Sequence, residues 1–106
     1  PVQAIVLPIN DDLVPYSTAV RESLRNAGLR VELDSRTESL NKKVREAQLN
    51  YIPLILTVGA KEKEADTLAV RTLDGNVKYG VNQETFLDTV LSHIRNREIS
   101  LELFNS

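Results

Sequence analysis

The sequence contains no cysteine, no tryptophan and no methionine, and its only histidine is His93. Without cysteine the chain cannot form a disulfide, a thiolate nucleophile or a cysteine-rich zinc site, and one histidine cannot form a histidine cluster. No motif places a serine or an acid beside His93, so we expect a structural histidine rather than a catalytic base. We therefore expect no metal, no other cofactor and no catalytic residue in this domain.

Long apolar runs and a predominant charge are also missing. No run approaches the ~20 residues that a membrane helix needs, and the N-terminus lacks the basic and apolar segments of a signal peptide. With 13 basic and 15 acidic residues, the net charge is only −2. A protein that coats nucleic acid by charge alone needs a broad basic surface. We expect a cytoplasmic protein without a membrane or DNA partner, in which any contact with RNA is local.

The 106 residues suffice for one hydrophobic core, so we expect a single domain over residues 1–106. The 42% apolar and 26% charged residues are typical of a folded globular protein. Pro1 is not a natural start residue. We therefore expect this domain to belong to a longer protein.

The apolar pattern alternates between strand and helix periods. It predicts strands at residues 2–9, 29–34 and 54–58, and an Asp-Gly hairpin that joins strands at residues 67–73 and 77–79. Helices are predicted at residues 16–27 and 40–51 and from Asn82 onward, with Gly28 and Asn82 as capping residues. This order predicts an α/β fold, in which a mixed sheet of about five strands is flanked by three helices.

Charged residues follow two of the predicted parallel strands. Arg36 comes after the second strand, and Lys61 and Glu62 come after the third. Ligands of open α/β sheets gather beyond the carboxyl ends of such strands, so we expect these side chains to converge at one edge. Arg71 lies within a strand, where a charge usually has a partner, and Glu62 is one possibility. A cluster of donors around a lone acid suits an unpaired RNA base, although each charge taken singly is more often a solvated surface group.

The second predicted helix has an apolar stripe at Leu40, Val44, Ala47 and Tyr51. The stripe predicts that Lys43, Arg45 and Glu46 lie on the outer surface of this helix. From there Lys43 and Arg45 could hold sugar and phosphate oxygens without reading sequence. For Tyr51, two interpretations stay open: the ring stacks on a base, or it fills the core at the end of the helix.

Six blocks carry a family resemblance, and the spacing between them fits as well. They are Asn-Ala-Gly-Leu-Arg-Val at 26–31, Asp34 with Arg36 and Glu38, Lys-Val-Arg-Glu at 43–46, Ile-Pro at 52–53, Gly59 with Lys61 and Glu62, and Ala-Val-Arg-Thr at 69–72. With these blocks the chain resembles the C-terminal anticodon-binding domains of threonyl-tRNA synthetases over nearly its whole length.

The resemblance implies a three-layer anticodon-binding fold that docks the anticodon loop of threonine tRNA during translation. The ligase activity, with its ATP and zinc, would belong to a catalytic domain of the same synthetase outside this chain. The parent enzyme would be a cytoplasmic homodimer. Glu62 and Arg71 match the base-reading acid and arginine of the family, and Lys61 precedes the acid as it does there.

The sequence departs from the family pattern at three further candidate RNA-binding residues. Tyr51, Thr37 and Ser39 stand where the family often has arginine, asparagine and lysine. One interpretation is that guanine recognition is rebuilt through stacking or through Arg36, and another is that the tRNA preference is altered. The alternatives are an accessory protein-interaction module that has lost anticodon reading and a nucleotide-binding enzyme, although the chain lacks the glycine-rich loop of the latter.

Overall fold

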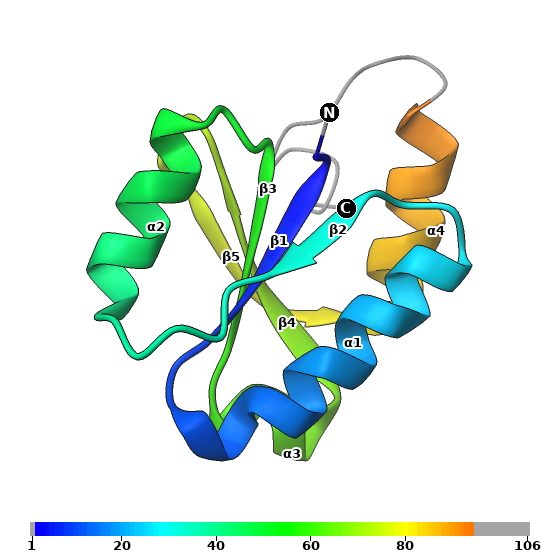
Figure 1. Cartoon of the computed structure of the whole chain (residues 1–106). Helices are drawn as coiled ribbons and strands as arrows, with labels where there is room; N and C mark the ends of the chain where they lie inside the picture. The colour runs from blue at the N-terminus through cyan, green and yellow to red at the C-terminus, as the bar shows by residue number, and fades with distance from the viewer. Residues whose placement is uncertain (1, 95–106) are drawn as a thin grey trace.

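The computed structural model describes the backbone of residues 2–94 and the side chains of residues 2–92, and it contains one sheet between two helical layers (Figure 1). The strands are β1 (Ala4–Pro8), β2 (Val31–Leu33), β3 (Leu54–Val58), β4 (Thr67–Thr72) and β5 (Val77–Asn82). A short 3-10 helix, η1 (Asp11–Leu13), precedes the helices α1 (Val14–Asn26), α2 (Leu40–Leu49), α3 (Ala60–Ala65) and α4 (Gln83–Ile94).

The sheet is mixed, as the order of elements predicts. Its strand order is β2-β1-β3-β4-β5. The strand β1 runs parallel to β2 and β3, whereas β4 is antiparallel to both β3 and β5. The predicted five-stranded α/β architecture is therefore confirmed, although β1 and β2 are shorter than residues 2–9 and 29–34.

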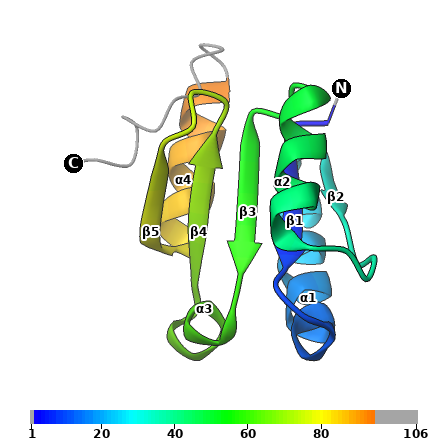
Figure 2. The ribbon, with the colours of Figure 1, turned by 90° about the vertical axis from the view of Figure 1, so that its left-hand side faces the viewer.

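The two central strands are buried on both faces, which explains their nearly continuous apolar sequence. On one face, Val6 and Leu56 belong to a core cluster that includes residues of α1 and α4. On the other face, Ile5 and Ile55 pack with Val44 and other residues of α2. Figure 2 shows α2 over β1 on its side of the sheet and α4 behind β4 and β5.

The predicted capping residues end and start helices as expected. Gly28 follows α1 with a φ of 106°, in the left-handed region that glycine tolerates. The side chain of Asn82 accepts hydrogen bonds from the backbone N–H groups of Glu84 (2.9 Å) and Thr85 (3.3 Å) at the start of α4. No helix within residues 2–94 combines the length and apolarity that a bilayer span requires.

The three predicted flanking helices are found as α1, α2 and α4, but a short fourth helix, α3, was not predicted. This helix has only six residues, and none of them is buried. An apolar stripe therefore could not reveal it. The available signal was Gly59 followed three residues later by Glu62, a pattern typical of a helix N-terminus.

Candidate nucleic-acid interface

The loops that follow the three parallel strands meet at one edge of the sheet. After β1, the Ile9 N–H donates to the carbonyl of Val58 at the end of β3 (2.9 Å). A cavity of about 210 Å³ lies between this loop and the one after β2, and its lining includes Asn10, Arg36 and Thr37. We call residues 9–10, 35–38 and 59–62 the strand-end rim. Arg36, Lys61 and Glu62 all belong to segments that leave this edge, but the bonds of Arg36 are to Asp34 and Glu46, so the convergence of the three side chains stays a prediction.

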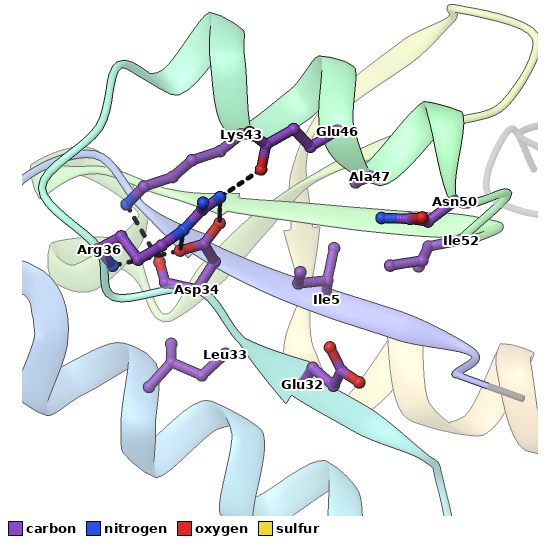
Figure 3. A pocket seen from close by; sticks show the side chains of 10 residues that line it. All are labelled: Ile5, Glu32, Leu33, Asp34, Arg36, Lys43, Glu46, Ala47, Asn50 and Ile52. Atoms are coloured by element: carbon purple, nitrogen blue, oxygen red, sulfur yellow. Dashed lines mark hydrogen bonds and ion pairs between the residues drawn. The ribbon is translucent and has the colours of Figure 1, made fainter.

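Arg36 is held by two carboxylates at this rim (Figure 3). Its Nε donates to Asp34 Oδ1 (2.9 Å) and its Nη2 to Asp34 Oδ2 (2.8 Å), and Nη2 also pairs with Glu46. The hydrogen bonds from Arg36 lower the pKa of Asp34, and the same two carboxylates raise the pKa of Arg36. Arg36 therefore connects the loop after β2 to α2, and its Nε and Nη2 are already engaged in hydrogen bonds. Glu46 as a partner was not predicted.

Lys43 is buried, so the prediction that it lies on the outer surface of α2 is wrong. Its exposed fraction is 4%, and its Nζ donates to the backbone carbonyl of Asp34 (3.1 Å). Lys43 comes three residues after Leu40 and four before Ala47, which puts it on the same helix face as these two. The spacing alone could have revealed this position. Lys43 also lines a cavity of about 250 Å³ between α2 and β2 (Figure 3).

The other candidates near α2 differ in their surroundings. Ser39 is the N-cap of α2, and its hydroxyl accepts a hydrogen bond from the backbone N–H of Lys42 (3.1 Å). Thr37 and Arg45 are exposed. Within residues 2–92, Arg45 has no hydrogen bond or ion pair through its side chain. Arg45 is thus available to an external anion, whereas Ser39 has a structural role in the free domain.

Glu62 and Lys61 lie in the first turn of α3. The Oε1 of Glu62 accepts a hydrogen bond from the backbone N–H of Gly59 (2.7 Å). A Cβ on Gly59 would lie 3.0 Å from this oxygen and 2.7 Å from Cδ1 of Ile9, so glycine allows the close approach. Lys61 is exposed. Glu62 therefore has one committed oxygen, and its partner is Gly59 rather than Arg71.

Arg71 lies apart from the strand-end rim. It stands opposite Ile55 in β3, so its side chain leaves the sheet on the side of α2. Since Ile55 precedes Gly59 by four residues, Arg71 is about 13 Å from the rim along the strand. Its Nε is buried without a hydrogen-bond partner in the described part of the chain. The expectation of one cluster containing Arg71 is wrong, but the orphan donor is a feature that few arginines show.

Tyr51 lies at the opposite end of α2 from Ser39. Its φ is 56°, a left-handed conformation that is rare for a bulky residue. The N–H of Tyr51 donates to Gln48 (3.0 Å), and that of Ile52 donates to Ala47 (3.1 Å), the pattern of a Schellman helix end that usually has glycine at this position. Ile52 is buried, whereas Tyr51 is 79% exposed. The interpretation that Tyr51 fills the core is therefore wrong.

A family model described as "Anticodon binding domain" matches residues 3–93. The chain belongs to the anticodon-binding domain family. The domain is 60% identical over 104 residues to a threonine–tRNA ligase of Desulfatibacillum aliphaticivorans, which covers 98% of the chain. It is 54% identical over 103 residues to that of Desulforapulum autotrophicum, which covers 97%. The chain spans about 16% of the length of each relative.

Solved structures agree with this family. The RNA-binding domain of threonyl-tRNA synthetase from Cryptosporidium parvum superposes with a TM-score of 0.79 at 28% identity, covering 87% of this chain and 23% of that one. A histidyl-tRNA synthetase from Nostoc gives a TM-score of 0.81 at 25% identity, covering 89% of this chain and 23% of that one. The anticodon-binding fold predicted from sequence is confirmed.

In this anticodon-binding domain, the candidate residues lie on the loop after β2, on α3, along α2 and on β4. The strand-end rim contributes Arg36, Thr37, Lys61 and Glu62. Ser39, Lys43 and Arg45 belong to the N-terminal part of α2 and its cap, while Tyr51 and Arg71 lie toward the end of the sheet where β3 begins. We call these nine positions the strip; they do not form a single cluster.

Proposed function

We propose that this domain recognises the anticodon loop of threonine tRNA and so positions the tRNA for a threonine–tRNA ligase domain outside residues 1–106. The observation that carries the proposal is the 54–60% identity to threonine–tRNA ligases over 97–98% of the chain. In this proposal ATP, zinc and the aminoacylation chemistry belong to the remainder of a homodimeric cytoplasmic enzyme. The domain itself is a binding module.

The chemistry of the strip supports base recognition. One oxygen of Glu62 is bound to Gly59, and its other oxygen can accept from the N1–H or exocyclic amine of guanine, since an ionised carboxylate is only an acceptor. Arg71 can donate to base oxygens. Unstacked bases in a loop expose the edges that such groups read. The unpaired Arg45 supplies a contact to the phosphate backbone.

A titration with two RNAs tests the proposal. One RNA is the stem-loop with the threonine anticodon, and the other carries adenine in place of the middle guanine. We expect tighter binding of the first by about 1–3 kcal/mol, the range of one good bidentate base contact. Equal affinities for the two RNAs contradict anticodon reading by this domain.

Two substitutions separate the reading and capping roles of Glu62. Glu62→Gln retains an oxygen for the Gly59 N–H but puts a donor where guanine also has donors. Glu62→Ala removes both functions. We expect the glutamine variant to keep the stability of the wild type and lose the preference for guanine, while the alanine variant loses both. A glutamine variant that still prefers guanine to the same degree would exclude Glu62 as the reader.

The accessory-module alternative depends on the departures at Tyr51 and Thr37 and on the net charge of −2. No relative described above favours it, because the matched curated proteins are ligases with high identity across this domain. It makes a distinct prediction in the same titration. An accessory module binds neither stem-loop, and it instead associates with a catalytic partner through an apolar patch.

A further inference from the structure

Helix α3 carries Lys61 and Glu62, yet it has no side chain in the core. None of its six residues is buried. A helix this short is not stable by itself, and most helices are held by the apolar face that they bury. Figure 2 shows α3 beyond the end of β3, beneath the sheet. The orientation of Glu62 must therefore come from contacts at the two ends of α3.

The N-terminal end of α3 is closed by two hydrogen bonds at Gly59. Its N–H donates to Glu62 Oε1 (2.7 Å), and its carbonyl accepts from the N–H of Lys63 (3.1 Å). These bonds involve α3 and its own cap only. They shape the first turn, but they do not fix the helix relative to the sheet or the other helices.

The C-terminal end is fixed to two other helices through Asp66. Its Oδ1 accepts hydrogen bonds from the Tyr16 hydroxyl of α1 (2.9 Å) and from Nε2 of Gln83 in α4 (2.6 Å). The same Nε2 lies 2.7 Å from the Tyr16 oxygen. These contacts join positions that are 50 and 17 residues from Asp66 in sequence. We call Tyr16, Asp66 and Gln83 the α3 anchor.

The backbone connects this anchor directly to Glu62. Asp66 adopts a left-handed conformation with a φ of 58°, and its N–H donates to the carbonyl of Glu62. Burial and the nearby Asp66 carboxylate raise the pKa of Tyr16 to about 12, so its hydroxyl stays a donor at neutral pH. Glu62 is also close enough to Tyr16 to contribute to this shift.

We infer that Tyr16, Asp66 and Gln83 are positioning residues for Glu62, holding α3 at the orientation in which one oxygen of Glu62 caps Gly59 and the other faces the RNA. The inference rests on the proposed function insofar as Glu62 reads a base. In this inference the three anchor residues act through α3 rather than by contact with the RNA. Their effect passes through Asp66 N–H to the Glu62 carbonyl and through the Glu62 carboxylate to Gly59.

The test compares Tyr16→Phe with Asp66→Asn and with Val90→Ala. The phenylalanine variant keeps the ring and removes the hydroxyl. Asparagine retains an oxygen acceptor and tolerates the left-handed conformation, so it serves as the conservative replacement. Val90 is fully buried in the core on the α4 side, and its truncation lowers stability without touching the anchor.

The first measurement is amide hydrogen exchange of Gly59 and Asp66 in the absence of RNA. We expect roughly fivefold faster exchange in Tyr16→Phe, the effect of losing one hydrogen bond, and near wild-type exchange in Asp66→Asn. Val90→Ala should change these amides no more than its global stability dictates. Unchanged exchange in Tyr16→Phe overturns the inference, whatever the RNA experiments show.

The second measurement is the ratio of dissociation constants for the guanine and adenine stem-loops. A general loss of stability does not change this ratio, but a misplaced Glu62 does. We expect the ratio to fall about fivefold in Tyr16→Phe and to stay unchanged in Val90→Ala. If the wild type shows no preference, the proposed function fails. If the wild type prefers guanine and Tyr16→Phe prefers it equally, only the inference fails.

Discussion

Tyr51 joins an unfavourable backbone conformation to a ring that is almost fully in solvent. A left-handed conformation costs a non-glycine residue about 1–2 kcal/mol, and the exposed ring gains little by packing. Strained residues of this kind persist most often where they serve a function. We therefore expect the exposed ring of Tyr51 to stack on an RNA base.

The substitutions Tyr51→Gly and Tyr51→Ala separate strain from stacking. Glycine removes the strain and the ring, and after its own entropy cost we expect a gain of about 0.5–1 kcal/mol in the free energy of unfolding. Alanine removes only the ring and should leave stability close to the wild type. Both should weaken stem-loop binding by about 1–3 kcal/mol, the range for one stacked base. Urea denaturation and RNA titration measure the two effects, and unchanged RNA affinity in both variants excludes stacking.

Asp34 gives the domain a defined sensitivity to acid. Its hydrogen bonds with Arg36 lower its pKa in the folded state, so the unfolded chain binds the proton more readily. The stabilising effect is present above the unfolded pKa of about 3.9 and is lost as the pH falls through the lower folded value.

We therefore expect Asp34→Asn to lower stability by about 1 kcal/mol at neutral pH, a modest value because Arg36 is largely in solvent. The variant should also show a shallower loss of stability below about pH 4. Urea unfolding as a function of pH measures both. Asp88→Asn, at an exposed position of α4, is the matched control. If stability falls below about pH 4 as steeply in Asp34→Asn as in the wild type, the role assigned to this carboxylate is contradicted.

At the scale of elements, α2 has two kinds of cation. Lys43 belongs to its buried face and binds the carbonyl of Asp34, while Arg45 projects into solvent without a partner in residues 2–92. Helical periodicity separates the two, although they are only two residues apart. We expect the first to stabilise the fold and the second to bind phosphate.

Alanine substitutions at Lys43 and Arg45 should affect different properties. The first should lower stability, and the second should weaken RNA binding. Lys43→Ala leaves a buried carbonyl unpaired and a space in the core, which should cost about 2–3 kcal/mol of unfolding free energy. Arg45→Ala should change stability by less than about 0.5 kcal/mol but weaken binding to every stem-loop and reduce the salt dependence by about one charge. Chemical denaturation and titrations at several salt concentrations provide the data. A stable Lys43→Ala variant would contradict the buried role.

For the whole molecule, the net charge of −2 limits how RNA can be held. Among the basic candidate residues, Arg36 is already paired with carboxylates and Lys43 is buried, which leaves Arg45, Lys61 and Arg71 for the RNA. For about two to three phosphate contacts, we expect the logarithm of the binding constant to fall with the logarithm of salt at a slope of about −2. A slope steeper than about −5 would require a broad basic surface that the strip does not provide.

The sheet, its mixed strand directions and most helix ends could be predicted from the amino-acid sequence. Apolar periodicity, the Asp-Gly hairpin and the caps at Gly28 and Asn82 are local signals, and each one follows from backbone sterics or from burial of one face. The six blocks of family resemblance also identified the anticodon-binding fold. Helix α3 was missed because it buries nothing and so has no apolar period.

Which charged side chains are free and which are paired depends on how the elements pack together. The pairing of Arg36 with Glu46, the hydrogen bond from Lys43 Nζ to the carbonyl of Asp34, and the anchor between Tyr16 and Asp66 join residues from separate elements. Such contacts depend on the distance between packed elements, which periodicity does not encode. The orphan Nε of Arg71 has the same origin, because strand register places it beside α2 and away from Glu62.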